Sequence, residues 1–165
     1  MAHHATTGVL ADMIGYFGAD ARMVQNTVKV HSFAKSIGER SHIEDRQLEI
    51  LEIAAILHDI GVPESFRKYN SGDRHEEEVP PVARKILESF DLDGDVVERV
   101  CYLVGHHHQY DKIDDVVFQI LVEADYLVNI FEGNVPHEAV SDIKAGRFKT
   151  EIGTSYLESM YSDRL

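Results

Sequence analysis

The stretch Ile53-Ala54-Ala55-Ile56-Leu57-His58-Asp59-Ile60-Gly61 decides how this chain is expected to fold. It begins as an apolar helix and ends with an imidazole and a carboxylate side by side, where Gly61 is suited to stop the helix. A helix that is apolar on nearly all sides lies at the centre of a bundle. An ionised carboxylate in such surroundings is costly unless it is paired or binds a metal. A divalent metal site is the simplest explanation, and a polar helix cap is the alternative for this pair taken alone.

The composition indicates a soluble globular protein. The chain of 165 residues is 44% apolar and 27% charged, which fits one domain, 1–165, that ends in a helical tail at 134–165. No apolar run approaches the length of a membrane span, and the N-terminus does not resemble a signal peptide. We therefore expect a cytoplasmic protein with no membrane partner, as a monomer or homodimer, and assign no role to His3 and His4.

The charge and the single cysteine exclude several classes of site. The formal net charge is −13, and the basic residues form no stripe of the kind that follows a phosphate backbone. Long nucleic acids are thus unexpected partners, and a small anionic substrate would need a local positive charge such as a bound metal. Cys101 is the only cysteine, which excludes an internal disulfide and a Cys-rich zinc site.

Hydrophobic periodicity predicts an all-α fold, a single-domain helical bundle. The segment 63–73 is expected to be a surface loop over the site, and 148–152 to be irregular. Helices are expected at residues 9–17, 20–37, 45–57, 82–90, 93–107 and 114–131, with a final one at 155–161.

Several further polar residues lie where metal ligands could lie. His31 and Asp125 fall within the apolar stripes of their helices, although a histidine there can also be a hydrogen-bonded core residue. His75 precedes an acidic helix start. The run His106-His107-His108 ends a helix, and three adjacent imidazoles cannot all face one point, so one or two are candidate ligands.

The order of these residues resembles a known family. His31, the His58-Asp59 pair and a distal Asp125 resemble the H…HD…D signature of the HD-domain superfamily of metal-dependent phosphohydrolases, over roughly residues 20–133. The resemblance implies a helical bundle of the HD-domain type in which these four residues bind a metal. Two imidazoles and two carboxylates suit Mn, Fe, Co, Ni or Zn. We expect one ion, and His75 with His106 or His107 has a spacing that also permits a second.

The expected function is hydrolysis of a small phosphate ester, a nucleotide-like phosphomonoester or phosphodiester. The catalytic residues would be Asp59 and His58, with the metal activating a water molecule and Asp59 or a nearby histidine taking the proton. The substrate phosphate has several candidate partners. They are Arg67, Lys68, Arg74 and Lys112.

Two other functions stay open at this point. The same scaffold carries di-iron oxygenases, and the candidate ligands would suffice for two irons. A non-catalytic binding module stabilised by a metal is the third class. Two branches of the family are disfavoured, because the chain lacks the Gly-Tyr-Pro element of the HD-GYP phosphodiesterases and the acidic pair that usually follows the HD motif in guanosine tetraphosphate hydrolases.

Overall fold

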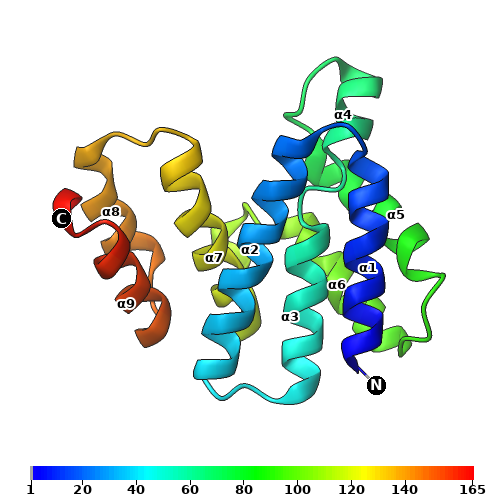
Figure 1. The fold of residues 1–165 in the computed structure, drawn as a ribbon, viewed down its shortest axis with the longest axis horizontal. Helices are drawn as coiled ribbons and strands as arrows, with labels where there is room; N and C mark the ends of the chain where they lie inside the picture. Colours follow the sequence, from blue (N-terminus) through cyan, green and yellow to red (C-terminus); the bar gives the residue numbers. More distant parts are fainter. Residues whose placement is uncertain (1) are drawn as a thin grey trace.

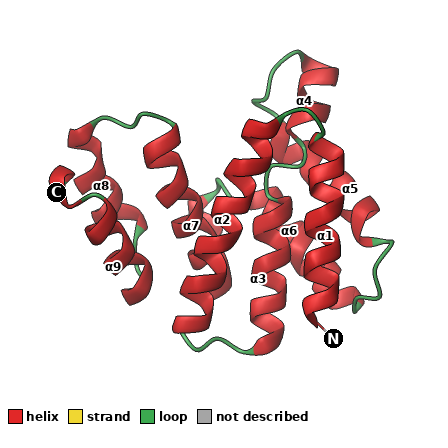
Figure 2. Ribbon diagram, viewed as in Figure 1, coloured by secondary structure: helices red, strands yellow, loops and turns green. Residues whose placement is uncertain are grey.

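The computed structural model describes residues 2–165, with side chains described from residue 5 onward, so the His3 and His4 side chains lie outside it. These residues form helices and no strand (Figure 2), which confirms the predicted all-α class. Within them, no helix is both long and apolar enough to cross a bilayer. The elements are α1 (Ala2–Phe17), α2 (Ala21–Arg40), α3 (Asp45–Leu57), α4 (Val62–Tyr69), α5 (His75–Leu87), α6 (Gly94–His106), η1 (Tyr110–Lys112), α7 (Val116–Glu132), α8 (His137–Arg147), α9 (Glu151–Met160) and η2 (Ser162–Arg164).

Helix α3 is the central element, as its sequence predicts. Every residue from Leu51 to Leu57 is buried, and α3 packs against α1, α2, α6 and α7 (Figure 1). Helix α2 presents Thr27, Val30, Ala34 and Ile37 to the core at helical spacing. Because apolar neighbours surround α3, the polar pair that follows it is held inside the molecule.

Gly61 sets the position of α5 relative to the end of α3. A Cβ atom at residue 61 would collide with the carbonyl oxygen of His75 and would lie 2.6 Å from the backbone nitrogen of Val79. Only glycine permits this close approach. The first turn of α5 therefore packs directly against the turn that follows His58 and Asp59.

The predicted loop at 63–73 is wrong in its first part, where the chain forms α4. Pro63 lies in the first turn, where proline is tolerated in a helix. Asn70 ends the helix in the left-handed conformation, with φ of 53°. Helix α5 also begins earlier than predicted, at His75, so Pro80 and Pro81 lie inside it.

The C-terminal helices are fixed by a buried carboxylate that the sequence analysis did not single out. Glu123 on α7 accepts hydrogen bonds from the backbone N–H groups of Lys149 and Thr150, at 2.9 and 3.0 Å, and from Thr150 Oγ1. Thr150 in turn accepts from Gly153 and caps α9, which replaces the irregular segment expected there. This network holds the segment between α8 and α9 against α7.

Candidate metal centre

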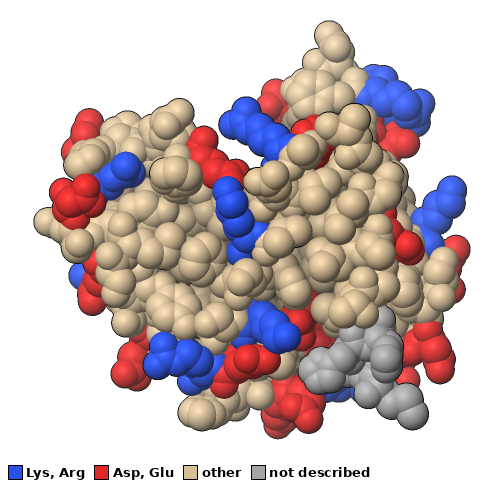
Figure 3. Space-filling view, in the orientation of Figure 1, with Lys and Arg blue, Asp and Glu red and all other residues tan. Residues whose placement is uncertain are grey.

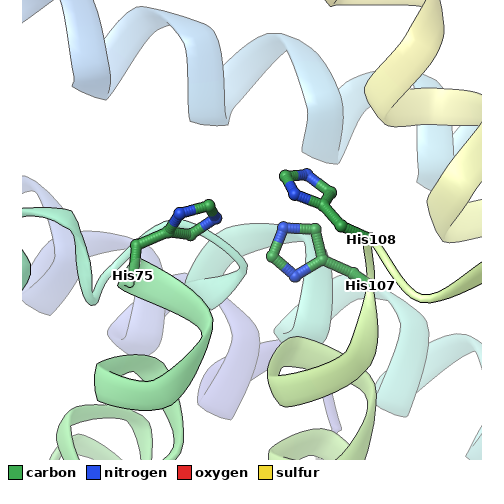
Figure 4. A group of neighbouring side chains, drawn as sticks. All are labelled: His75, His107 and His108. Carbon is green, nitrogen blue, oxygen red and sulfur yellow. The ribbon is translucent and has the colours of Figure 1, made fainter. Parts of the chain in front are cut away.

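Six side chains converge where α3, α5 and α6 meet the middle of α7. The pair at residues 58 and 59 follows the last residue of α3, residue 75 begins α5, and residues 107 and 108 follow α6. Figure 4 shows the three histidines from α5 and α6 turned toward one another. The six are His58, Asp59, His75, His107, His108 and Asp125.

The two carboxylates lie between the imidazoles. Asp59 Oδ2 is 3.1 Å from His58 Nε2, whereas Asp59 Oδ1 is 3.4 Å from His75 Nε2 and 3.6 Å from His107 Nε2. Asp125 is 3.4 Å from His58 through Oδ1 and 3.5 Å from His108 through Oδ2. The two oxygens of Asp59 thus face different histidines, which is the arrangement of a carboxylate that can bridge two ions.

Backbone carbonyls fix the tautomers of three of these imidazoles. The Nδ1 atoms of His58, His75 and His107 lie 2.7, 3.0 and 2.8 Å from the carbonyl oxygens of residues 55, 72 and 104. A carbonyl oxygen only accepts, so each Nδ1 carries a hydrogen. In the neutral ring, Nε2 then carries the lone pair and is free to bind a metal.

The Nε2 atoms of these three histidines are buried and have no hydrogen-bond partner. The carboxylate oxygens beside them lie 3.1 to 3.6 Å away, and these contacts are not hydrogen bonds. Buried polar groups are almost always satisfied, and unsatisfied ones require an explanation. Neutral imidazole lone pairs and carboxylates that all face one region repel one another unless a cation lies between them. The residues present therefore fit a bound divalent metal.

The surrounding protein shifts the pKa values of the residues in this cluster. Burial lowers the pKa of His58, but Asp59 and Asp125 outweigh it and hold that pKa well above its usual value. Burial raises the pKa of Asp59, and His58 and His107 more than reverse this, so the pKa falls well below its ordinary range. For His75, burial dominates and lowers the pKa. The carboxylates are thus ionised and available as ligands.

The link between α5 and α6 brings the last two histidines into place. The Glu76 carboxylate accepts a hydrogen bond from the backbone N–H of His108 at 2.7 Å. His106, the other candidate of this run, turns away: its ring stacks on Tyr102 at 4.3 Å, and its Nδ1 lies 2.7 Å from the Tyr102 carbonyl oxygen. The sequence left open which of the three faced the site, and the structure places His107 and His108 there.

His31, a metal ligand expected from the sequence, is not brought into this cluster by the structure. Its Nε2 atom is 3.0 Å from the buried Glu52 carboxylate on α3. Glu52 precedes His58 by six residues, which is about 9 Å along a helix. The α2 side chains that line a pocket together with Asp59 are instead Arg22, Met23 and Asn26.

A pocket of about 620 Å³ adjoins Asp59 between the ends of α1, α2, α4 and α7. Arg22 is the basic residue in its wall. The basic residues expected to hold phosphate have other contacts: Arg67 pairs with Glu64, and Lys68 pairs with Glu78 at 2.8 Å.

The remaining two candidates also lie away from this pocket wall. The Arg74 guanidinium lies 4.6 Å from the Tyr69 ring centroid, and Lys112 is exposed on η1. The face in Figure 3 shows basic side chains separated by acidic and uncharged ones.

The family model of the HD domain matches residues 23–130. The chain belongs to the HD-domain family. This HD domain is also similar to the crystal structure of a predicted HD superfamily hydrolase from an uncultured Thermotogales bacterium, with a TM-score of 0.70 and 22% identity over 98% of this chain and 85% of that one. At that identity the likeness shows the fold, and it confirms the predicted HD-type bundle. No curated protein matches the chain.

Proposed function

We propose that this HD domain is a metal-dependent phosphohydrolase that acts on a small phosphate ester. One observation carries the proposal: three buried imidazoles, each fixed through Nδ1, direct unpartnered Nε2 atoms toward two carboxylates. Membership of the HD family adds the expectation of hydrolase chemistry.

The donor set suits two transition-metal ions. His58, one oxygen of Asp59 and one of Asp125 would hold the first ion, and the other Asp59 oxygen with His75 and His107 would hold the second. Mixed imidazole and carboxylate ligands favour Mn, Fe, Co, Ni or Zn over a magnesium site built from oxygen alone. This assignment revises the single ion expected from the sequence, because Asp59 faces both groups of histidines.

The side chains have separate tasks in this proposal. When bound, the ions would lower the pKa of a coordinated water and polarise the phosphoryl oxygen. Both oxygens of Asp59 would be held by the ions, so the proton of the attacking water would pass to a nearby histidine. The His108 side chain is 41% exposed and lies against Asp125, so it is the imidazole of the cluster that can exchange a proton with solvent or with the leaving group.

The substrate partners follow from the pocket. Arg22 is the side chain there that can pair with a phosphate, in place of the four basic residues expected from the sequence. The volume of about 620 Å³ fits a small molecule rather than a nucleic acid. We therefore propose a small phosphorylated substrate and no nucleic-acid or membrane partner.

The test is phosphate release from a panel of phosphomonoesters and phosphodiesters, with each candidate metal supplied in turn and oxygen uptake recorded in parallel. We expect metal-dependent phosphate release without oxygen uptake, and loss of release in Asp59→Asn. Oxygen uptake with a polyol or phosphonate by the iron-loaded protein would identify an HD-type oxygenase instead. Binding of metal without turnover on any member of the panel would indicate a metal-stabilised binding module.

A further inference from the structure

The Asp125 carboxylate accepts a hydrogen bond from an uncharged side chain of its own helix. Asn129 lies one turn further along α7, and its Nδ2 atom donates to Asp125 Oδ1 at 2.8 Å. The same oxygen is 3.4 Å from His58 Nε2, and Asp125 Oδ2 is 3.5 Å from His108 Nε2. Since a carboxylate only accepts hydrogen bonds, the amide nitrogen of Asn129 must be the atom that faces Asp125. This bond fixes the direction in which Asp125 presents its oxygens to the imidazoles.

A second amide, on α2, holds Asn129 in this orientation. Asn26 Nδ2 lies 3.4 Å from Asn129 Oδ1 and donates to Glu132 Oε2 at 2.8 Å. The other oxygen of Glu132 accepts from Lys29 Nζ at 2.7 Å. Rotating the Asn129 amide would place its oxygen against the Asp125 carboxylate and its nitrogen against the Asn26 nitrogen. Both contacts would then join like groups, so the amide has one favourable orientation.

An uncharged donor suits a carboxylate that binds a cation. A lysine or arginine at residue 129 would place a positive charge beside the ion and repel it. The Asn129 amide forms the hydrogen bond and leaves the negative charge of Asp125 for the ion. The Asp125 side chain is only 12% exposed, so few water molecules could replace this donor.

We propose that Asn129 is a positioning residue of the metal centre, which orients Asp125 and thereby strengthens the binding of one of the two ions. That ion is the one assigned above to His58, Asp59 and Asp125. Within the described part of the chain, Asn129 forms no hydrogen bond with His75 or His107, which would hold the other ion. The assignment of two ions rests on the proposed function, but the role of Asn129 in metal binding does not need turnover.

The test is titration of the chelator-treated full chain with Mn²⁺, followed by calorimetry at a temperature well below the melting point of every variant. We expect Asn129→Ala to raise the Kd of one ion by about 10- to 100-fold, the usual effect of removing a group that orients a metal ligand. The Kd of the other ion should stay at its wild-type value. A general loss of stability would weaken both ions, so the selective effect is specific to positioning.

Three further variants identify the affected ion and control for folding. Asp125→Ala should lose the same ion as the one weakened in Asn129→Ala, and adding Asn129→Ala to it should not weaken the ion that remains. Asn129→Leu, similar in size, removes the donor without creating a cavity and should reproduce the loss if Asn129→Ala does not fold. Lys29→Met breaks the ion pair at the outer end of the network, where the Lys29 side chain is 47% exposed, and should leave both Kd values unchanged.

The outcomes separate this role from the proposed function. Unchanged affinity for every bound ion in both Asn129 variants, or equal weakening of both ions, would overturn the role of Asn129. If metal-dependent phosphate release were observed together with such a result, the phosphohydrolase function would still stand. Selective weakening of one ion, with no phosphate released from any ester by the wild-type protein, would support the role of Asn129 and overturn the phosphohydrolase function.

Discussion

The Nε2 atom of His58 lies 3.1 Å from Oδ2 of Asp59, although the other nitrogen of the same ring is already bound to the carbonyl of Ala55. Two states of the site can account for this short distance. Either His58 is protonated and forms an ion pair with the carboxylate, or a metal ion lies between the two groups. The two states have opposite dependence on pH, which makes them distinguishable in solution.

In the metal-free protein, stability should fall as the pH rises. The folded pKa of His58 lies well above the unfolded value of about 6.5 because of Asp59 and Asp125, after the opposing effect of burial. The stabilisation from the protonated ring is therefore complete below about pH 6.5 and is lost as the pH rises through the folded pKa. With Mn²⁺ bound, protons compete with the metal, so stability should rise over the same range. Melting temperatures between about pH 6 and 9, with chelator and with Mn²⁺, test this; equal trends in both samples would contradict it.

Adjacent histidines should have different effects on metal content. His107→Ala removes an Nε2 atom that faces Asp59, so the protein should lose about one of two ions per chain and most of its turnover. His106→Ala is the matched control, because that ring stacks on Tyr102 outside the cluster. Elemental analysis of both purified variants checks the prediction. Equal metal content in the two variants would remove His107 from the site.

Replacing His31 should change stability and leave the metal content unchanged. His31→Ala leaves the buried Glu52 carboxylate without its partner at 3.0 Å, with Lys35 only at 4.0 Å. An unpaired buried charge is strongly destabilising, so we expect a loss of about 2–4 kcal/mol in the free energy of unfolding, measured by urea denaturation. The double variant His31→Ala with Glu52→Gln should recover part of the lost free energy of unfolding, because it removes the buried charge. A loss of bound metal in the single variant would restore His31 as a ligand.

Glu123 should contribute more to stability than a surface carboxylate of the same type. Glu123→Ala leaves the N–H groups of Lys149 and Thr150 without acceptors, which predicts a loss of about 2–4 kcal/mol in the free energy of unfolding. Glu98→Ala, which breaks an exposed pair with Arg84, should cost less than about 1 kcal/mol. Urea denaturation of the two variants provides the comparison, and equal losses would contradict the role of Glu123.

The sequence predicted the parts of the fold that depend on local patterns. The apolar character of α3 and the stripes of α2 and α7 were sufficient to identify the bundle, and the position of Asp125 inside an apolar stripe made it a candidate ligand. The C-terminal tail was less predictable. Helix α9 depends on the contact of Thr150 with the distant Glu123, which no local pattern reveals.

The site could be predicted only in part. Whether a side chain reaches it depends on how far along its helix the residue lies, and the sequence pattern does not give the position of one helix relative to another. His31 lies on the core-facing side of α2, as predicted, but too far along the helix to reach His58. The sequence pattern does not mark Asn26, since a lone asparagine carries no spacing signal. The choice of His107 and His108 over His106 depends on where α6 ends and on the Glu76 contact. That hydrogen bond joins residues far apart in the sequence.

The central claim is that the six clustered side chains form a metal centre, and metal binding to the chelator-treated wild-type protein tests it most directly. We expect Mn²⁺ or Zn²⁺ titration to saturate near two ions per chain and to raise the melting temperature, because the ions join α3, α5, α6 and α7. Asp59→Ala, which removes the carboxylate facing both groups of histidines, should bind neither ion tightly. A folded wild-type protein that binds no divalent ion and melts at the same temperature with or without metal would contradict the claim.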